Sequence, residues 1–313
     1  MAVTVAAQVL AKVSRFGGID PIGAGAVLLS ALGFGTLATL TKVAYAEGVS
    51  APALILWRFG FSTLFVFLTL PFEWWRRGSL VGTQPWTRHR TLLALLAVAC
   101  FTGNTTLYLV ALQRISVSTA AILFYVYPLV VVGFRLLGWR EVPSIRQLIA
   151  IVAALSGTAI TLGWRWGGID PFGAIMMILS ASLYAGYIVL AHRGFRDASP
   201  VAVTACTFSA TTLFALLFVW ASNESLMITL PALAPVLGIV VFATFLPVQL
   251  FLIGTVRLGP TPAAILGTFE PVASVLIAML TLGERLGGAQ LLGGLLVLTA
   301  AILVRGEEGR RPE

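Results

Sequence analysis

Ten long apolar stretches follow one another along the chain and leave few folds open to it. They lie near residues 22–46, 51–71, 91–112, 117–138, 146–164, 171–192, 200–220, 230–253, 261–281 and 288–305. Most of them approach the length of about 20 residues that an α-helix needs to cross the hydrocarbon core of a bilayer. Because lipid offers the backbone no hydrogen-bond partner, such stretches must be helices. The sequence therefore predicts an all-α membrane protein with ten transmembrane helices.

The composition supports this prediction, because it cannot cover a surface that faces water. Hydrophobic residues make up 58% of the chain and charged residues only 10%, whereas about a quarter of the residues of a soluble domain are charged. A membrane β-barrel would show alternating polarity, and these stretches are apolar on all sides. We therefore expect the lipid bilayer to be a partner of this chain.

The basic residues are distributed unequally between the predicted loops. If the N-terminus lies inside, fourteen Lys and Arg residues fall in inside segments and four fall outside or near an outer helix end. This positive-inside bias predicts that both termini are cytoplasmic and that the protein lies in the inner (plasma) membrane. The net charge of +8 is then a topology signal, and we expect no nucleic-acid partner.

The second half of the chain repeats the first. Gly-Gly-Ile-Asp-Pro at 17–21 recurs at 167–171, and Ala-Ala-Ile-Leu at 120–123 recurs at 263–266. Each copy contains five predicted helices, which is an odd number, so the second copy must be inverted in the membrane relative to the first. Inverted repeats are a common plan of secondary transporters, whose substrates bind near the midplane where the halves meet.

The repeat also predicts how the chain divides. We expect the first five-helix repeat at 1–165, with a short cytoplasmic lead-in at 1–21. The second, inverted repeat is expected at 166–305, followed by a cytoplasmic tail at 306–313.

Three sequence features resemble a known family. They are Trp57-Arg58-Phe59 in the second span and two further stretches, one from Pro128 to Glu141 and one from Glu270-Pro271 through Leu282-Gly283-Glu284-Arg285 to Gln290. They are similar to the drug/metabolite transporter superfamily, and within it to the EamA-type ten-helix permeases. The first stretch departs from the family pattern, because Trp139-Arg140 stands where Leu-Gly is usual.

The resemblance implies a secondary transporter that exports small metabolites, above all amino acids and aromatic ones among them, by alternating access. The family motifs are architectural, so the substrate does not carry over from them. Export of drugs or other amphipathic metabolites is the alternative.

Glu270 is the main candidate for a functional residue in the membrane. A charge within a span costs at least about 2.5–3.5 kcal/mol, so it needs a partner, a wet cavity or a function. Glu270 precedes Pro271, which removes one helical hydrogen bond and favours a kink. Its repeat partner, Tyr127, should lie at the same depth in the other half. We expect both to bind the substrate, with proton coupling through Glu270; a structural ion pair with Arg58 is the alternative.

Two basic residues within the predicted spans are further candidates for substrate binding. Arg58, in the second span, can bind a substrate carboxylate bidentately or brace the helices through main-chain carbonyls. Lys42, near the outer end of the first span, either lines the site or reaches toward the interface.

Aromatic and amide side chains complete the predicted substrate-binding site. Asn104 and Tyr108 are one turn apart on the third span, Tyr184 and Tyr187 share a face of the sixth, and Gln249 lies mid-span in the eighth. Hydrogen bonds between helices are the alternative reading for each of them. Together they predict a polar, aromatic pocket at the centre of the membrane.

The sequence contains no recognisable motif for catalysis, for a metal or for a nucleotide. Its two histidines and two cysteines are not at metal-ligand spacings, and no G-x-x-x-x-G-K-S/T loop for ATP is present. We therefore expect no cofactor, no metal and no enzymatic activity, and a membrane enzyme or a passive channel is the less favoured alternative. The coupling ion and the oligomeric state stay open.

Overall fold

The computed structural model describes residues 20–80, 85–115, 117–162, 170–222, 226–273 and 288–304, and the regular structure in these ranges is helical. The first half contains α2 (Pro21–Phe34), α3 (Leu37–Ala46), α4 (Ala51–Arg77), α5 (Arg88–Arg114), α6 (Val117–Phe124), α7 (Tyr127–Trp139) and α8 (Ile145–Leu162). The second half contains α9 (Pro171–Gly194), α10 (Pro200–Ser222), α11 (Leu230–Val240), the π-helix η1 (Val241–Phe245), α12 (Leu246–Leu258), α13 (Pro260–Gly267) and α15 (Gly288–Val304).

Seven spans in the described ranges are long and apolar enough to cross a membrane. They are Pro21–Ala46, Ala51–Arg76, Arg88–Arg114, Thr119–Trp139, Pro171–Gly194, Pro200–Ala221 and Leu230–Leu258, with a shorter apolar helix at Ile145–Ile160. The predicted all-α membrane fold is confirmed. The ninth predicted span continues past Ala273 into residues that lie outside the described ranges, as do most of the lead-in and the whole tail.

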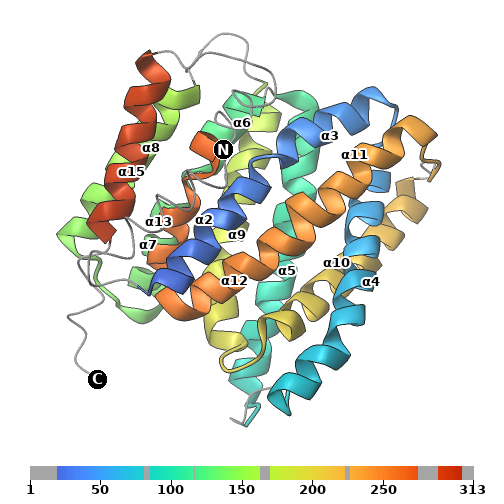
Figure 1. The fold of residues 1–313 in the computed structure, drawn as a ribbon, viewed down its shortest axis with the longest axis horizontal. Helices are drawn as coiled ribbons and strands as arrows, with labels where there is room; N and C mark the ends of the chain where they lie inside the picture. Colours follow the sequence, from blue (N-terminus) through green and yellow to red (C-terminus); the bar gives the residue numbers. More distant parts are fainter. Residues whose placement is uncertain are drawn as a thin grey trace.

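The main helix contacts join one half of the chain to the other. In the centre, α2 packs on α12 and α5 packs on α9, while α4 packs on α10 and α8 on α15 at the two ends (Figure 1). When the five spans of each half are numbered in chain order, the first span of each half packs on the third span of the other half. The second span packs on the second, and the fifth on the fifth. This is the pseudo-twofold arrangement of two inverted five-helix repeats. Their sequence limits stay a prediction, because residues 163–169 are outside the described ranges.

Two ion pairs repeat this symmetry at opposite ends of the bundle. Asp20 caps α2 by accepting a hydrogen bond from the Ile22 amide at 3.0 Å, and its other oxygen lies 2.7 Å from Nη1 of Arg257. Asp170 caps α9 in the same way and lies 3.8 Å from Nη1 of Arg114. In each case the aspartate of one half pairs with the arginine of the other. The hydrogen bond from Arg257 holds the pKa of the Asp20 carboxyl below its usual value.

The fourth span is broken in the middle, and the start of the ninth span is broken at the equivalent place. The helix α6 ends at Phe124 and α13 ends at Gly267, and helical structure resumes at 127 and 270. Each break lies four residues before a proline, Pro128 or Pro271, that has no amide hydrogen to donate to the carbonyl at that position. The two breaks expose main-chain groups at the middle of the membrane, where discontinuous helices form substrate sites in transporters.

Close packing of α9 on α5 depends on Gly194. A β-carbon at this position would lie 2.5 Å from the backbone nitrogen of Ala94 and 2.8 Å from its α-carbon. We expect Gly194→Ala to lower the free energy of unfolding by about 1–3 kcal/mol, because a backbone cannot yield as a side chain does. Thermal unfolding in detergent measures this effect. The control is Gly133→Ala, since nothing lies within 4 Å of the added methyl group; equal losses in both variants would contradict the packing argument.

Candidate functional site

A small central cavity lies where the two halves meet. Its volume is about 70 Å³, and its lining comes from α2, α3, α4, α5, α6, α7, α9, α12 and α13 together with Glu270. Seven of the nine predicted site residues line it: Arg58, Asn104, Tyr108, Tyr127, Tyr184, Tyr187 and Glu270. The structure thus brings together side chains that the sequence places on five different helical segments.

Glu270 lies at the first residue after the break that follows α13, and it is half-buried. Its carboxylate accepts a hydrogen bond from the hydroxyl of Tyr125, a residue that is only 3% exposed. Sequence analysis missed Tyr125, because a continuous helix would turn it away from the face of Tyr127. The break after Phe124 changes that geometry, and the rings of Tyr125 and Tyr127 lie 6.4 Å apart between their centroids.

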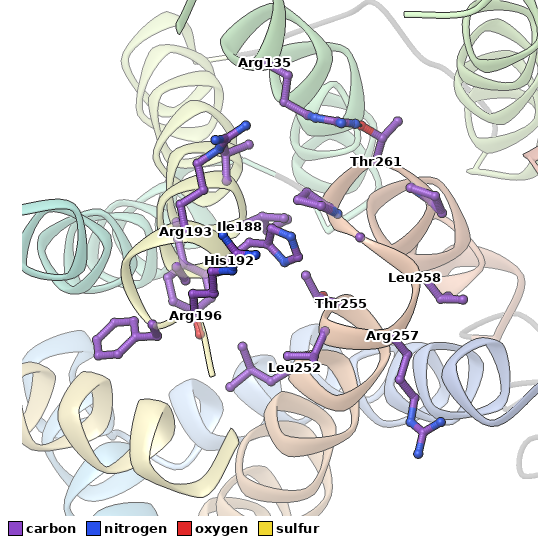
Figure 2. A pocket seen from close by; sticks show the side chains of 18 of the residues that line it. Arg135, Ile188, His192, Arg193, Arg196, Leu252, Thr255, Arg257, Leu258 and Thr261 are labelled. Atoms are coloured by element: carbon purple, nitrogen blue, oxygen red, sulfur yellow. The ribbon is translucent and has the colours of Figure 1, made fainter. Parts of the chain in front are cut away.

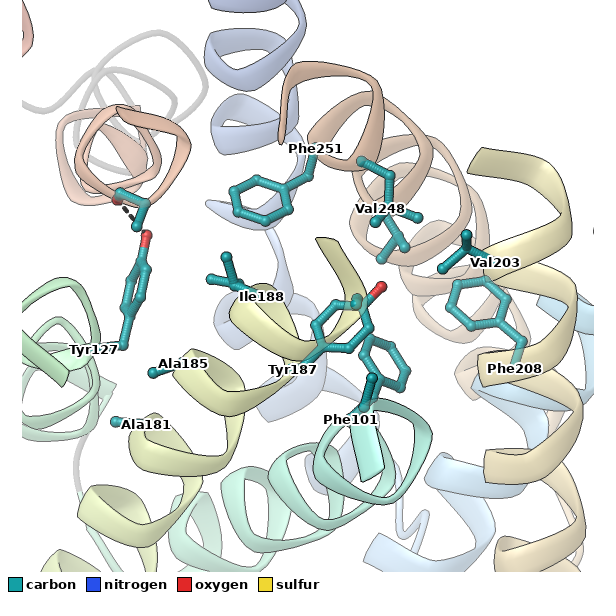
Figure 3. Packing of buried hydrophobic residues seen from close by; sticks show 14 of the residues in the cluster. Phe101, Tyr127, Ala181, Ala185, Tyr187, Ile188, Val203, Phe208, Val248 and Phe251 are labelled. Atoms are coloured by element: carbon teal, nitrogen blue, oxygen red, sulfur yellow. Dashed lines mark hydrogen bonds between the residues drawn. The ribbon is translucent and has the colours of Figure 1, made fainter. Parts of the chain in front are cut away.

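Tyr127 connects the two broken spans. Its hydroxyl donates a hydrogen bond of 2.7 Å to the carbonyl of Ala264 on α13 (Figure 3). This carbonyl needs an outside donor, because the amide of Thr268 turns to Ile265 at the break. Gly267 allows the approach, since a β-carbon there would lie 2.5 Å from the Tyr127 hydroxyl. The symmetry partner of Glu270 therefore has a bracing contact and also faces the cavity.

Arg58 is buried against the π-helix η1. Its Nε donates a hydrogen bond of 2.7 Å to Oγ1 of Thr244, and its Nη2 lies 3.5 Å from the carbonyl oxygen of Ala243. The guanidinium also lies 4.9 Å from the centroid of the Phe59 ring. A π-helical turn frees main-chain carbonyls and often occurs at functional sites. The described contacts of Arg58 are thus those of a brace, while the residue also lines the cavity.

Aromatic rings form most of the wall of the cavity. The ring centroid of Tyr184 lies 5.0 Å from that of Tyr127 and 6.0 Å from that of Phe251. The ring centroids of Tyr187 and Phe101 lie 4.9 Å apart. Phe101, Phe124 and Phe251 were not predicted, because a phenylalanine in an apolar span gives no signal in sequence.

Two hydroxyl groups near the cavity, those of Ser180 and Tyr187, differ in whether they have a hydrogen-bond partner. Ser180 donates to the side-chain and main-chain oxygens of Asn104 at 2.9 and 3.0 Å. The buried hydroxyl of Tyr187 has no hydrogen-bond partner in the described part of the chain. It points toward Val248 (Figure 3).

Two of the predicted site residues, Lys42 and Gln249, do not line this cavity. The Nζ of Lys42 donates a hydrogen bond of 2.8 Å to the carbonyl of Leu112 in the last turn of α5, where a cation is favourable. Gln249 follows Val248, which does line the cavity, and one helical residue turns the side chain by about 100°. Its amide nitrogen is buried and has no partner among the described residues.

A second, much larger cavity of about 1880 Å³ opens at one end of the bundle (Figure 2). We call it the vestibule; the ends of α7, α9 and α12 and the start of α13 form its walls. Tyr187 and Phe251 line both cavities, so the two cavities adjoin at these side chains. Near its mouth, Glu141 pairs with both Arg135 and Arg193.

The opposite end of the bundle is filled by apolar side chains. Buried residues of α3, of the first turns of α4, and of α11 and η1 form one cluster there; it comprises Leu37, Ala44, Val49, Ala53, Leu54, Ala232, Val236, Ile239 and Ala243. The central cavity thus adjoins the vestibule on one side and is covered by packed side chains toward the other face.

Comparison with known proteins agrees with this architecture. A model of the EamA-like transporter family matches residues 21–163 and 171–306. The uncharacterized transporter YcbK of Bacillus subtilis is 30% identical over 206 residues, which are 63% of this chain and 66% of that protein. The threonine/homoserine exporter RhtA of Salmonella typhimurium is 24% identical over 201 residues, 64% of this chain and 66% of the exporter. Both relatives are therefore matched over slightly less than two thirds of their length.

A solved crystal structure superposes with a TM-score of 0.74 at 21% identity, covering 92% of this chain and 98% of the other. At this identity the likeness concerns the fold alone.

Proposed function

Because the chain belongs to the EamA-like transporter family, we propose that it is a secondary transporter that exports small metabolites, most of all amino acids, by alternating access. The observation that carries this proposal is the cavity at the junction of the halves, which adjoins the open vestibule on one side and is covered by packed side chains on the other. A carrier needs such a shape, whereas a passive channel needs a continuous path. The relatives are named as transporters, which supports this role over that of an enzyme.

The vestibule lies at the end of the bundle that carries most of the arginines. By the positive-inside rule, we propose that this end is cytoplasmic, with both termini on the same side in a cell membrane. The structure then corresponds to an inward-open state, ready to accept cargo for export. Labelling of single cysteines from either side of intact cells would test this orientation.

The chemistry of the central cavity favours an amphipathic zwitterion. Arg58 can bind a carboxylate, Glu270 an ammonium group, and the rings of Tyr184 and Phe251 an apolar side chain. The name of the relative RhtA, a threonine/homoserine exporter, supports an amino acid. The alternative is a drug or another amphipathic metabolite, which would use the same rings and Glu270 without the guanidinium.

The volume of the central cavity indicates how the substrate binds. A water molecule occupies about 10–15 Å³ on this scale, so a cavity of about 70 Å³ holds a few waters but no amino acid. We propose that the substrate binds where this cavity meets the vestibule and that side chains there move on binding. Tyr187 and Phe251 line both spaces and are the first candidates for this movement.

Counterflow in proteoliposomes tests the proposed function. Purified protein is reconstituted, the vesicles are loaded with one unlabelled amino acid, and uptake of the labelled form is followed for aromatic amino acids, threonine and homoserine. We expect saturable uptake that depends on the internal load for at least one of them. Flux that rises linearly with concentration would indicate a channel, and an absence of counterflow for every amino acid would reject the proposed substrate class.

A further inference from the structure

The charges that line the vestibule are strongly unbalanced. Among the described residues of its lining, seven arginines face only two carboxylates, Glu141 and Asp197. Glu141 is held between Arg135 and Arg193, and two of the other arginines pair with carboxylates outside the lining, Asp20 and Glu73. The cavity therefore keeps an excess of positive charge that its own acids do not balance.

Two of these arginines lie on one wall, which we call the basic wall. Arg193 and Arg196 lie on and just after the last turn of α9, next to His192, whereas the wall formed by α12 presents Leu252 and Thr255 (Figure 2). Arg257, also on α12, points away from the space toward α2 (Figure 2). A substrate that enters must pass between a cationic wall and an apolar, hydroxyl-bearing wall.

Membrane topology alone does not explain this arrangement. The positive-inside rule requires basic residues in the loops of one face, but it does not require them to line a cavity. Here two of them are fixed over aromatic rings: Arg193 lies 4.3 Å from the Trp139 ring centroid and Arg90 lies 4.6 Å from that of Trp86. Arg90 is further held by the carbonyls of Gly194 and Arg196. These contacts hold guanidinium groups in place around the passage.

The inverted repeat provides an internal comparison. Through the offset of 150 that relates Asp20 to Asp170, the counterparts of Arg193 and Arg196 in the other half are Val43 and Ala46. The counterpart of His192 is Lys42, whose ammonium group donates to the carbonyl of Leu112. The two arginines of the basic wall are therefore absent from the other half.

We infer that the vestibule is an anion-attracting antechamber, which concentrates carboxylate-bearing substrates at the mouth of the central cavity and excludes cations of the same size. This inference rests on the proposed transport function and narrows its substrate class to zwitterions and anions. A cleft with charges of one sign and low-dielectric walls raises the local concentration of the opposite charge by about 10–1000-fold. Cationic drugs and basic amino acids are then poor substrates from this side.

The first experiment measures the potential in the vestibule without any substrate. Cys100 and Cys206 are replaced by alanine, and a cysteine is introduced at Val256, which lines the vestibule and is 63% exposed. Its rate of modification is measured with the anionic sulfonatoethyl and the cationic trimethylammonioethyl methanethiosulfonate, each relative to a free thiol. We expect the anionic reagent to be favoured at least about tenfold. A ratio of one or below would overturn the inference and leave the proposed transport function untouched.

Two arginine variants and a salt series show whether the lining causes this preference. Arg196→Gln, at an exposed residue of the basic wall, should reduce the ratio about threefold or more. Arg88→Gln is the matched control, because Arg88 is exposed near the same face but does not line the vestibule. Raising the salt from about 10 mM to about 1 M shortens the Debye length from about 30 Å to about 3 Å, and the ratio should fall toward one. Equal effects of the two variants would assign the preference to the whole face.

The second experiment tests the substrate class with three probes that share one ring. Phenylpyruvate is an anion, phenylalanine a zwitterion and phenethylamine a cation, and each competes with counterflow of the best amino acid from the vestibule side. We expect the first two to compete and the cation to be weaker than phenylalanine by at least about tenfold. Strong competition by phenethylamine, with the anionic reagent still favoured at Val256→Cys, would show that the vestibule potential does not select the substrate.

Discussion

Replacing Glu270 with glutamine is expected to lower the rate of amino acid counterflow by about 10–100-fold. The variant keeps the size of the side chain and a partner for Tyr125, but it removes the negative charge from the central cavity. A hydrogen bond to a charged group contributes about 1.5–3 kcal/mol, and each 1.4 kcal/mol corresponds to a factor of ten. The substrate ammonium loses that partner, and the carrier loses its acid within the membrane. Initial rates at several pH values measure both effects, because the pH dependence of transport should also flatten.

The control distinguishes the loss of the carboxylate in the central cavity from the loss of a negative charge elsewhere in the protein. Glu47→Gln removes a carboxylate from an exposed position at the end of α3 and should leave the rate unchanged. Glu270→Asp keeps the acid and should retain part of the rate. If Glu270→Gln folds normally and transports with the rate and pH response of the wild type, Glu270 neither binds the substrate nor couples protons.

Most of the residues that line the central cavity could be proposed from the sequence, because they lie on regular helices. Asn104 and Tyr108, or Tyr184 and Tyr187, share a face by helical spacing alone, and the repeat related Tyr127 to Glu270. Lys42 and Gln249 do not line the cavity. The first binds the C-terminal end of α5, and the second lies one residue beyond the face of α12 that lines the cavity.

The remaining features depend on departures from regular helix. Tyr125 reaches Glu270 only because the fourth span breaks at Phe124, and the breaker itself, Pro128, lies four residues further along the chain. Arg58 finds its partners on a π-helical turn that no periodicity predicts. The arginines that line the vestibule come from loops and helix ends far apart in sequence, so each of them resembled a topology signal when taken alone.

Replacing Arg58 with glutamine is expected to weaken substrate binding by at least about tenfold and also to destabilise the fold. The side chain has two tasks: it braces α4 against η1 through Thr244 and Ala243, and it lines the central cavity. Loss of a guanidinium–carboxylate contact, at about 1.5–3 kcal/mol, accounts for the effect on binding. Loss of the brace leaves a buried hydroxyl and a carbonyl without their donor, which costs a further 1–3 kcal/mol or so in the free energy of unfolding.

Thr244→Val separates these two tasks, because it removes the acceptor of the brace and leaves the guanidinium in the cavity. It should lower the thermal stability to a degree comparable with Arg58→Gln, yet keep the apparent affinity for the amino acid within about threefold. Arg58→Lys keeps the positive charge but loses the fork that binds a carboxylate bidentately, so its affinity should fall between the two. If Thr244→Val and Arg58→Gln lower affinity equally, Arg58 acts only as a brace, and the carboxylate of the substrate must bind elsewhere. The arginines of the vestibule would then be the next residues to test, because they are the cations nearest to the path that the substrate follows.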